Sequence, residues 1–189
     1  MSDPREELLA RVERLTVSFP GRAAPAVDGV SLAIRAGECV ALVGESGSGK
    51  SLTARALLGL LPRAAEVAFE RLEVVSPEGR GSRPAAAPPP TPAAGSRSWT
   101  AIRGALAALV PQDALGGLDP LRRIEHEVGD ALRLHRLAAG VERRRRVIAA
   151  LAAAGFPDPA ARLHQRPGGL SCRLRQRAVV ASALIADPR

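Results

Sequence analysis

The chain has 189 residues, of which 46% are hydrophobic, and this is enough for one globular domain with a packed core. Its formal net charge of +8 would suit an anionic partner, but aromatic residues make up only 2% of the chain, which argues against base-stacking platforms for single-stranded nucleic acid. The excess of Arg over Lys is equally well explained by a genome rich in G and C. Residues 1–10 carry acids where a signal peptide has basic and then apolar residues, and no apolar run approaches about 20 residues, so we expect a cytosolic chain.

The first elements are predicted from apolar patterning. Alternation over 15–19 and 30–34, separated by a turn that contains Pro and Gly, predicts a pair of antiparallel strands. The continuous apolar run Cys39–Val43 is bounded by glycines and is typical of a strand buried on both faces, in which Cys39 would be an inert thiol. Apolar residues at helical spacing then predict a helix over 52–60, which Pro62 ends.

The middle of the chain changes character. Residues 67–75 form a second candidate strand region. Residues 76–98 are dominated by Pro, Ala, Gly, Ser and Arg, a composition that does not pack as a core element, and we expect a flexible surface insertion. The apolar run Ala105–Val110 then predicts another buried strand.

Two helices are predicted after this run, over 124–137 and 141–154. The second carries an apolar stripe formed by Val141, Ile148 and Leu151, and Gly155 would end it. Its run of four arginines, 143–146, is most simply a solvated helix face, and a grip on a phosphate backbone is the alternative interpretation.

The chemistry concentrates in one motif, G-x-x-x-x-G-K-[ST], which consists of Gly44, Glu45, Ser46, Gly47, Ser48, Gly49, Lys50 and Ser51. Its glycines let successive backbone N–H groups turn toward a phosphate chain. Lys50, the only lysine in the chain, supplies a compact ammonium, and the Ser51 hydroxyl is placed to ligate Mg²⁺ at the start of a helix. A flexible Gly/Ser turn is the alternative, but the predicted strand before the motif and helix after it favour a phosphate-binding loop.

Further motifs follow in a fixed order. They are Val110-Pro111-Gln112-Asp113 with Leu118-Asp119-Pro120, then Leu170-Ser171, and then Arg175-Gln176-Arg177. Together with the glycine loop, this set resembles the ATP-binding subunit of ABC transporters, and most of all the branch that imports peptides and nickel. The resemblance covers the chain from about Leu15 to Arg189.

The resemblance implies an α/β fold: a P-loop NTPase domain of the ABC ATPase type, with a parallel core sheet, an antiparallel β subdomain and a helical subdomain. Residues 1–112 would be the nucleotide-binding core with its antiparallel β subdomain, and they include the insertion at 76–98. Residues 113–170 would be the helical subdomain. Residues 171–189 would be the signature helix that returns to the core, where the domain stops incomplete at its C-terminus.

The resemblance also assigns roles to site residues, with ATP and Mg²⁺ as cofactors. Phe19 would stack on adenine, although it could be an ordinary strand aromatic. Gln112 would ligate Mg²⁺ and the attacking water while its loop touches the membrane subunit, although it could be a plain loop amide. Ser171, Cys172 and Arg173 would contact ATP that is held by a second subunit.

Two departures from the family pattern bear on catalysis. Cys172 and Arg173 stand where the family has two glycines, so we expect a weak signature contact to the partner's nucleotide. The Asp-Glu pair that supports Mg²⁺ and activates water would lie beyond Arg189, so no catalytic base is identifiable. The expectation is a C-terminally truncated subunit that binds Mg-ATP and is impaired in hydrolysis.

The implied partners are a second ATP-binding subunit, in a homodimer or heterodimer, and transmembrane permease subunits. The implied location is the cytoplasm, peripheral on the inner face of the cell membrane. Two alternatives stay open: a non-hydrolysing structural or regulatory partner in a heterodimer, and an ABC-type ATPase linked to nucleic acid, which the basic charge would suit. No nucleic acid partner is expected under the leading interpretation.

Overall fold

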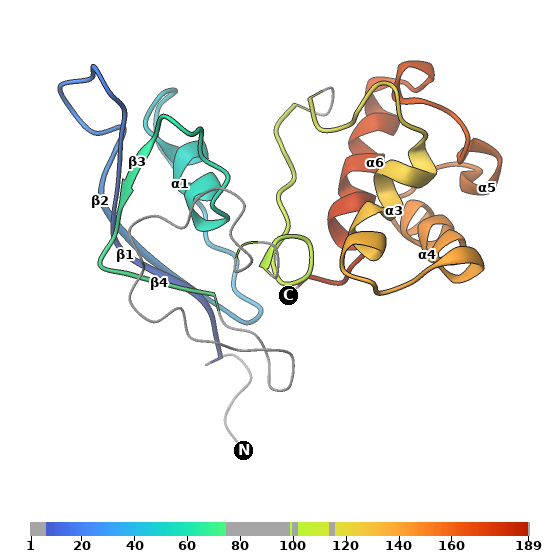
Figure 1. Ribbon diagram of the computed structural model, residues 1–189, viewed down its shortest axis with the longest axis horizontal. Helices are drawn as coiled ribbons and strands as arrows, with labels where there is room; N and C mark the ends of the chain where they lie inside the picture. Colours follow the sequence, from blue (N-terminus) through green and yellow to red (C-terminus); the bar gives the residue numbers. More distant parts are fainter. Residues whose placement is uncertain (1–6, 75–98, 100–101, 114–115, 189) are drawn as a thin grey trace. The chain divides into compact units, whose positions relative to one another are not determined.

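The computed structural model describes residues 7–74, 99, 102–113 and 116–188. The chain divides into a first unit, Met1–Ile102 together with Arg189, and a second unit, Arg103–Pro188. Among the described residues, the first unit contains a sheet and a helix that packs on it, and the second unit is helical (Figure 1). The insertion predicted at 76–98 lies outside the described residues, and the predicted division at 112 and 170 stays a prediction.

An antiparallel sheet forms the framework of the first unit. Its central strand β1 (Leu8–Ser18) pairs with β2 (Val27–Arg35) along one edge and with β3 (Glu66–Ala68) and β4 (Arg71–Val74) along the other. In the β1–β2 register, Leu15 lies opposite Val30. The antiparallel pair predicted from alternation is confirmed, and the second strand region is present as the short strands β3 and β4.

Helix α1 (Lys50–Leu57) packs on this sheet. Ala56 joins four valine and leucine side chains of β1 and β2, Val12, Leu15, Val17 and Val27, in one buried cluster. The helix ends before Pro62, because Leu58 already leaves the helical conformation and Gly59 has φ +60°. The buried indole of Trp99 lies against Gly59, where an added Cβ would be 2.4 Å from Trp99 Cε2.

Two predicted strands are absent from the described sheet. Residues 39–43 form no strand, Cys39 is exposed, and the Val43 side chain is 93% exposed. Residues 105–110 likewise form no strand, apart from one bridge between Arg103 and Ala107. A buried strand needs neighbours for its N–H and C=O groups, and β1–β4 pair only with one another. The parallel core sheet is therefore not formed among the described residues, and burial of Cys39 was a wrong expectation.

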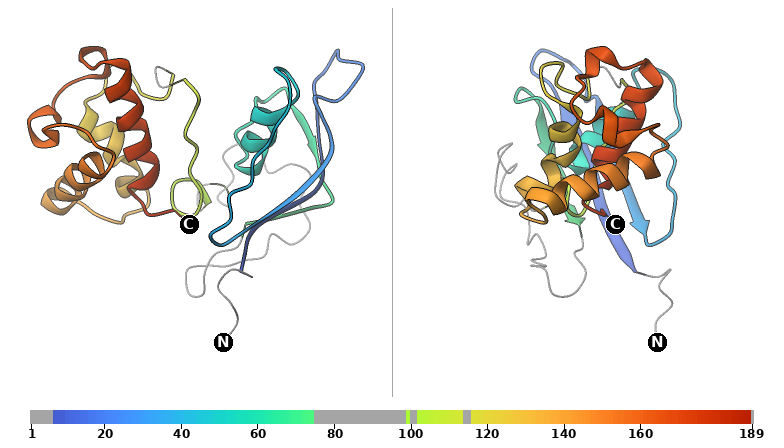
Figure 2. Two further views of the ribbon diagram at one scale, coloured as in Figure 1. Left: turned by 180° about the vertical axis from the view of Figure 1, so that it is seen from behind. Right: turned by 90° about the vertical axis from the view of Figure 1, so that its right-hand side faces the viewer.

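The second unit has its own helical core. It contains α3 (Ile124–Leu134), α4 (Gly140–Ala153), α5 (Pro159–Arg162), a 3₁₀ turn η2 (Pro167–Gly169) and α6 (Cys172–Leu184). Helices α3, α4 and α6 pack against one another (Figure 2). Ile124, Leu132, Leu151 and Leu163 are fully buried between them. Both predicted helices are confirmed: α3 begins at the predicted residue and ends three residues early, and both ends of α4 differ from the prediction by one residue.

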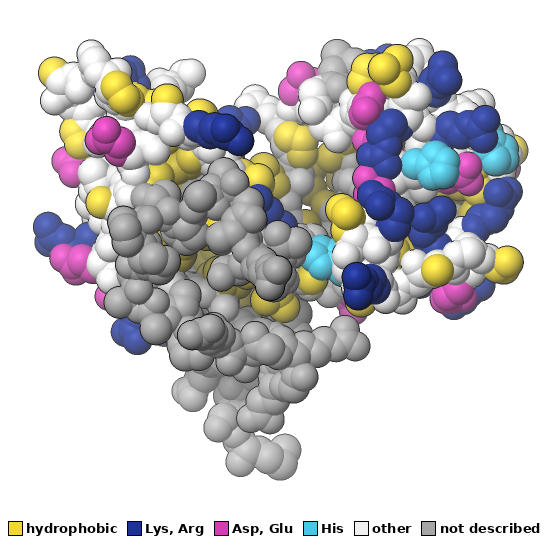
Figure 3. Space-filling view, in the orientation of Figure 1, with side chains coloured by type: hydrophobic (Ala, Val, Ile, Leu, Met, Phe, Trp, Pro, Cys, Tyr) yellow, Lys and Arg dark blue, Asp and Glu magenta, His cyan; other side chains and the backbone are white. Residues whose placement is uncertain are grey.

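The predicted faces of α4 need correction. Val141 is 87% exposed, and the buried stripe consists of Val147 and Leu151, because the first turn of α4 extends beyond the core. The four arginines do not form a uniformly solvated face. Arg146 donates from Nη2 to the Ile185 carbonyl oxygen at 3.1 Å, and Arg145 pairs with a carboxylate at 2.8 Å. Arginine side chains nevertheless cover much of the second-unit surface in Figure 3.

Within the described ranges, none of the helices combines the length and the apolar character needed to cross a membrane.

Candidate phosphate-binding site

The phosphate loop, residues 44–51, takes its shape from left-handed backbone at two glycines. Gly47 has φ +85° and Gly49 has φ +87°, and Gly49 is the N-cap of α1. The Ser48 N–H donates to the Glu45 carbonyl oxygen at 3.3 Å and closes a turn inside the loop. Residues with a Cβ rarely adopt these backbone angles, so glycine occupies the positions where the loop requires positive φ.

Gly49 is also a point of close packing. A Cβ built on Gly49 would lie 2.5 Å from the carbonyl oxygen of Ala26 and 3.0 Å from Val27 Cγ2. A Cβ on Gly47 would meet nothing within 4 Å. The backbone of the β1–β2 turn therefore rests directly on the start of α1, and only a glycine at 49 allows this approach.

The Lys50 ammonium folds back over the loop. Its Nζ donates to the carbonyl oxygens of Gly44 at 2.8 Å and Glu45 at 2.5 Å, and to the Ser48 hydroxyl at 3.2 Å. Residues 44–48 are exposed, so solvent and ligands can reach the loop around this cation. A phosphate chain offers the ammonium oxygen acceptors that carry full negative charge, which make stronger hydrogen bonds than neutral carbonyls.

The first turn of α1 supplies a second source of positive potential. It contains no acidic residue, so no side chain there offsets the partial charge of the free N–H groups. The Thr53 hydroxyl donates to the Gly49 carbonyl oxygen at 3.1 Å and holds the first turn in place, while Ser51 is exposed. An exposed hydroxyl at this position can ligate Mg²⁺, which commonly takes one or two protein ligands and completes its shell with phosphate oxygens and water.

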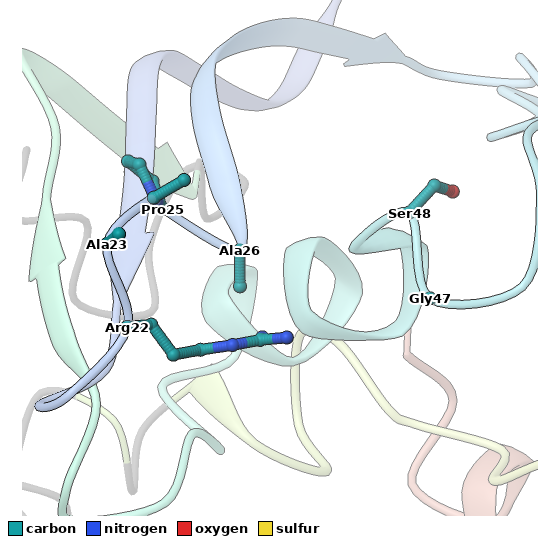
Figure 4. A pocket seen from close by; sticks show the side chains of 7 residues that line it. Arg22, Ala23, Pro25, Ala26, Gly47 and Ser48 are labelled. Atoms are coloured by element: carbon teal, nitrogen blue, oxygen red, sulfur yellow. The ribbon is translucent and has the colours of Figure 1, made fainter.

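A pocket of about 450 Å³ opens beside the loop (Figure 4). Its lining consists of Arg22, Ala23, Ala24, Pro25 and Ala26 from the β1–β2 turn, and of Gly47 and Ser48 from the phosphate loop. The turn contributes small apolar groups and one cation, and the loop contributes backbone and a hydroxyl. The pocket therefore places the positive charge of Arg22 next to the backbone of this loop.

The other predicted ligand residues are divided between the units. Phe19 belongs to the first unit, is half-buried and packs against the cluster beneath the sheet. Gln112 is exposed and belongs to the second unit. The structure thus brings Phe19, but not Gln112, into the same unit as the phosphate loop, and the roles of both stay predictions. Sequence reasoning did not single out Arg22, although its place three residues after Phe19 was a usable signal.

The signature residues lie at the start of α6. Ser171 is the N-cap, and its hydroxyl accepts a hydrogen bond from the Leu174 N–H at 3.4 Å. Cys172 and Arg173 follow in the first turn with exposed side chains, and buried Leu170 anchors the approach to the helix. The predicted helix start is confirmed, whereas a contact to a partner's nucleotide stays a prediction.

An ionic cluster holds the segment Leu118-Asp119-Pro120 against α3. Arg122 Nη1 lies 2.6 Å from Asp130 Oδ2 and 2.8 Å from Glu127 Oε1, and Glu127 Oε2 accepts the Asp119 N–H at 3.0 Å. The hydrogen bond from Arg122 lowers the pKa of Asp130, and burial opposes this only in part. The same hydrogen bond raises the pKa of Arg122. Both groups are therefore charged at neutral pH.

Comparison with known proteins matches residues 27–189 to the family model described as ABC transporter. The chain is 36% identical to the peptidoglycan transport ATP-binding protein YejF of Agrobacterium fabrum, with all of this chain and 33% of that protein covered. It is 35% and 33% identical to the dipeptide transport ATP-binding proteins DppD of Bacillus subtilis and Escherichia coli, with 96% of this chain and 52% of each relative covered. The chain thus spans a third to about half the length of these relatives.

Solved structures give the same picture of the fold. The ATP-binding cassette MJ0796, in a dimeric post-hydrolysis state bound to ADP and Pi, matches with a TM-score of 0.71 and 26% identity. The match covers 95% of this chain and 70% of that one. The cbiO1 protein of Clostridium perfringens shares the fold at 21% identity and a TM-score of 0.63. The predicted fold class is confirmed, and the chain covers only part of the cassette.

Proposed function

This chain belongs to the ABC transporter family, and on that premise we propose that it is the ATP-binding subunit of a peptide importer, or a part of that subunit. One observation carries the proposal: the Lys50 ammonium lies over a glycine loop that caps α1. Relatives that are named as dipeptide transport ATP-binding proteins support the choice of cargo.

In the proposed site, the backbone N–H groups of the phosphate loop bind the phosphates of ATP. Lys50 exchanges its carbonyl acceptors for phosphate oxygens, which carry full charge. Ser51 would hold Mg²⁺, and the ion would neutralise charge on the phosphate chain. Phe19 would stack on the adenine ring at the other end of the nucleotide.

Hydrolysis coupled to import is proposed for the assembled transporter. As the family resemblance implies, the general base would belong to the part of the cassette that this chain does not cover. Partners would be a second ATP-binding subunit and the permease subunits, on the cytoplasmic face of the membrane. The dimeric state of the similar cassette MJ0796 supports a paired arrangement.

The start of α6 favours a second candidate function, a partner that binds ATP without efficient turnover. As the family resemblance implies, Cys172 and Arg173 would place side chains where close backbone approach to the opposite nucleotide requires glycine, and loss of one transition-state donor typically costs roughly a hundredfold to a thousandfold in rate. Steady ATP turnover by this chain alone, if Lys50→Ala abolished it, would exclude this candidate. An ATPase linked to nucleic acid has no observation in its favour beyond the net charge of +8.

The test is equilibrium binding of Mg-ATP to the 189-residue chain and to its Lys50→Ala variant. A hydrogen bond to a charged group contributes roughly 1.5–3 kcal/mol, so Lys50→Ala should weaken binding by about 10- to 150-fold. The emission of Trp99, the only tryptophan and a buried one, reports whether the first unit of the variant is folded. Equal affinities in a folded variant would refute the assignment of the loop.

A further inference from the structure

The pocket beside the phosphate loop contains a cation that the loop motif does not account for. Arg22 lies in the turn between β1 and β2 and lines the pocket together with Gly47 and Ser48. Within the ranges that the structure describes, no carboxylate pairs with its guanidinium, which is solvent-exposed. Figure 4 shows the side chain extended from the turn toward α1. A charged group in this position is available to a ligand.

The turn that carries Arg22 is fixed with respect to the loop. The Arg22 N–H donates to the Phe19 carbonyl oxygen at 3.2 Å, and the Ala26 N–H donates to the Val17 carbonyl oxygen at 2.7 Å. The Ala26 carbonyl oxygen in turn rests against Gly49. The turn that contains Arg22 is thus held both to β1 and to the start of α1. Ligand binding therefore costs little entropy for ordering the backbone of this turn.

The two cations have different neighbours in the loop, with Ser48 common to both. Lys50 is hydrogen-bonded to the carbonyl oxygens of Gly44 and Glu45 and to the Ser48 hydroxyl, whereas Arg22 lines a pocket with Gly47 and Ser48. In phosphate loops of this type, the backbone N–H groups cradle the α- and β-phosphates, and the lysine reaches the β- and γ-phosphates. Arg22 lies on the Gly47–Ser48 side of the loop, in a turn that begins at Phe19. This position suits the α-phosphate, which is the phosphate nearest the base.

We propose that Arg22 binds the α-phosphate of the nucleotide and so adds affinity that ADP and ATP share. A guanidinium suits this role, because its planar donors can form two parallel hydrogen bonds to phosphate oxygens. Ala23 and Ala24 line the same pocket, and their side chains are only methyl groups. The inference rests on the proposed function, since it requires a nucleotide in the phosphate loop.

The experiment compares the dissociation constants of ATP and ADP for the 189-residue chain and for two variants, Arg22→Gln and Arg63→Gln. Arg63 is an exposed arginine of the same unit that does not line the pocket, so its variant matches the change in net charge. Arg22→Gln should weaken ATP and ADP by the same factor, about 10-fold or 1.4 kcal/mol. Arg63→Gln should change either affinity by less than about twofold, because an exposed charge that does not line the pocket is screened by solvent and salt.

Two results would overturn the inference while leaving the proposed function intact: equal affinities for the Arg22→Gln and Arg63→Gln variants, or a loss for ATP alone. The latter would place Arg22 at the γ-phosphate. Failure of the unmodified chain to bind either nucleotide would overturn both proposals. Unchanged Trp99 emission in Arg22→Gln establishes that the first unit keeps its structure.

Discussion

Gly49→Ala tests the contact on which the geometry of the phosphate loop depends. Gly49 combines φ +87° with a Cβ position 2.5 Å from the Ala26 carbonyl oxygen, so the substitution brings both backbone strain and a collision with backbone. Left-handed φ costs a residue with a Cβ about 1–2 kcal/mol, and overpacking adds about 1–3 kcal/mol. We therefore expect a loss of roughly 2–5 kcal/mol in the stability of the first unit.

Gly47→Ala is the matched control. It has nearly the same angle, φ +85°, but an added Cβ meets nothing within 4 Å, so only the strain of about 1–2 kcal/mol applies. The effect of each substitution on the entropy of the unfolded chain is the same and cancels in the comparison. The difference between the two variants thus isolates the collision with Ala26.

The assay is urea unfolding followed by Trp99 emission, because Trp99 packs against Gly59 directly after α1. Trp99 lies in the first unit, so its emission follows the unfolding of the unit that carries the substitution. Gly49→Ala should unfold at clearly lower urea than Gly47→Ala and should bind ATP more weakly. If the two variants shared one midpoint, the turn would not rest on the loop as described.

Further predictions concern the second unit. Leu132 of α3 is fully buried, so Leu132→Ala should lower the free energy of unfolding by about 2–5 kcal/mol, measured by heat or urea. Leu134 is 62% exposed, so Leu134→Ala should lower it by less than about 0.5 kcal/mol. Equal losses for the two variants would contradict the described orientation of α3. The Arg122 hydrogen bond lowers the pKa of Asp130 in the folded protein below its unfolded value of about 3.9. The pair therefore stabilises the folded state fully above about pH 3.9, and this stabilisation is lost as the pH falls through the lower folded pKa. Asp130→Asn should therefore cost roughly 0.2–1 kcal/mol at neutral pH, since the pair is partly exposed. A cost that persisted unchanged in acid would exclude this ion pair as its source.

The sequence was most informative where the pattern is local. Alternation in 15–19 and 30–34 predicted the β1–β2 pair, and helical spacing predicted α3 and α4. The loop from Gly44 to Ser51 could be recognised because the spacing of its glycines and Lys50 is a local sequence pattern that needs no knowledge of distant contacts. The ordered motifs after the loop indicated the ABC transporter family, and the comparison with the family model confirms it.

Predictions that depended on distant partners were wrong. The apolar run Cys39–Val43 has the composition of a buried strand, but no described strand pairs with it, and the Val43 side chain is exposed. Val141 fits the period of α4, yet it lies in a first turn that extends beyond the core. Periodicity specifies which residues share a face, whereas burial depends on what covers that face. Arg22 follows Phe19 by three residues, but its place beside the loop depends on the packing of its turn on Gly49, which the sequence pattern does not show.

The most direct test of the nucleotide site is an NMR titration of the ¹⁵N-glycine-labelled chain with Mg-ADP and Mg-ATP. Phosphates held by the backbone of the loop should shift the amide signals of Gly47 and Gly49 most strongly, assigned from the Gly47→Ala and Gly49→Ala variants. Glycines of the second unit, such as Gly129 in the middle of α3, should shift little. Unchanged Gly47 and Gly49 signals at saturating nucleotide, or larger shifts at Gly129, would contradict the assignment of this loop as the nucleotide site.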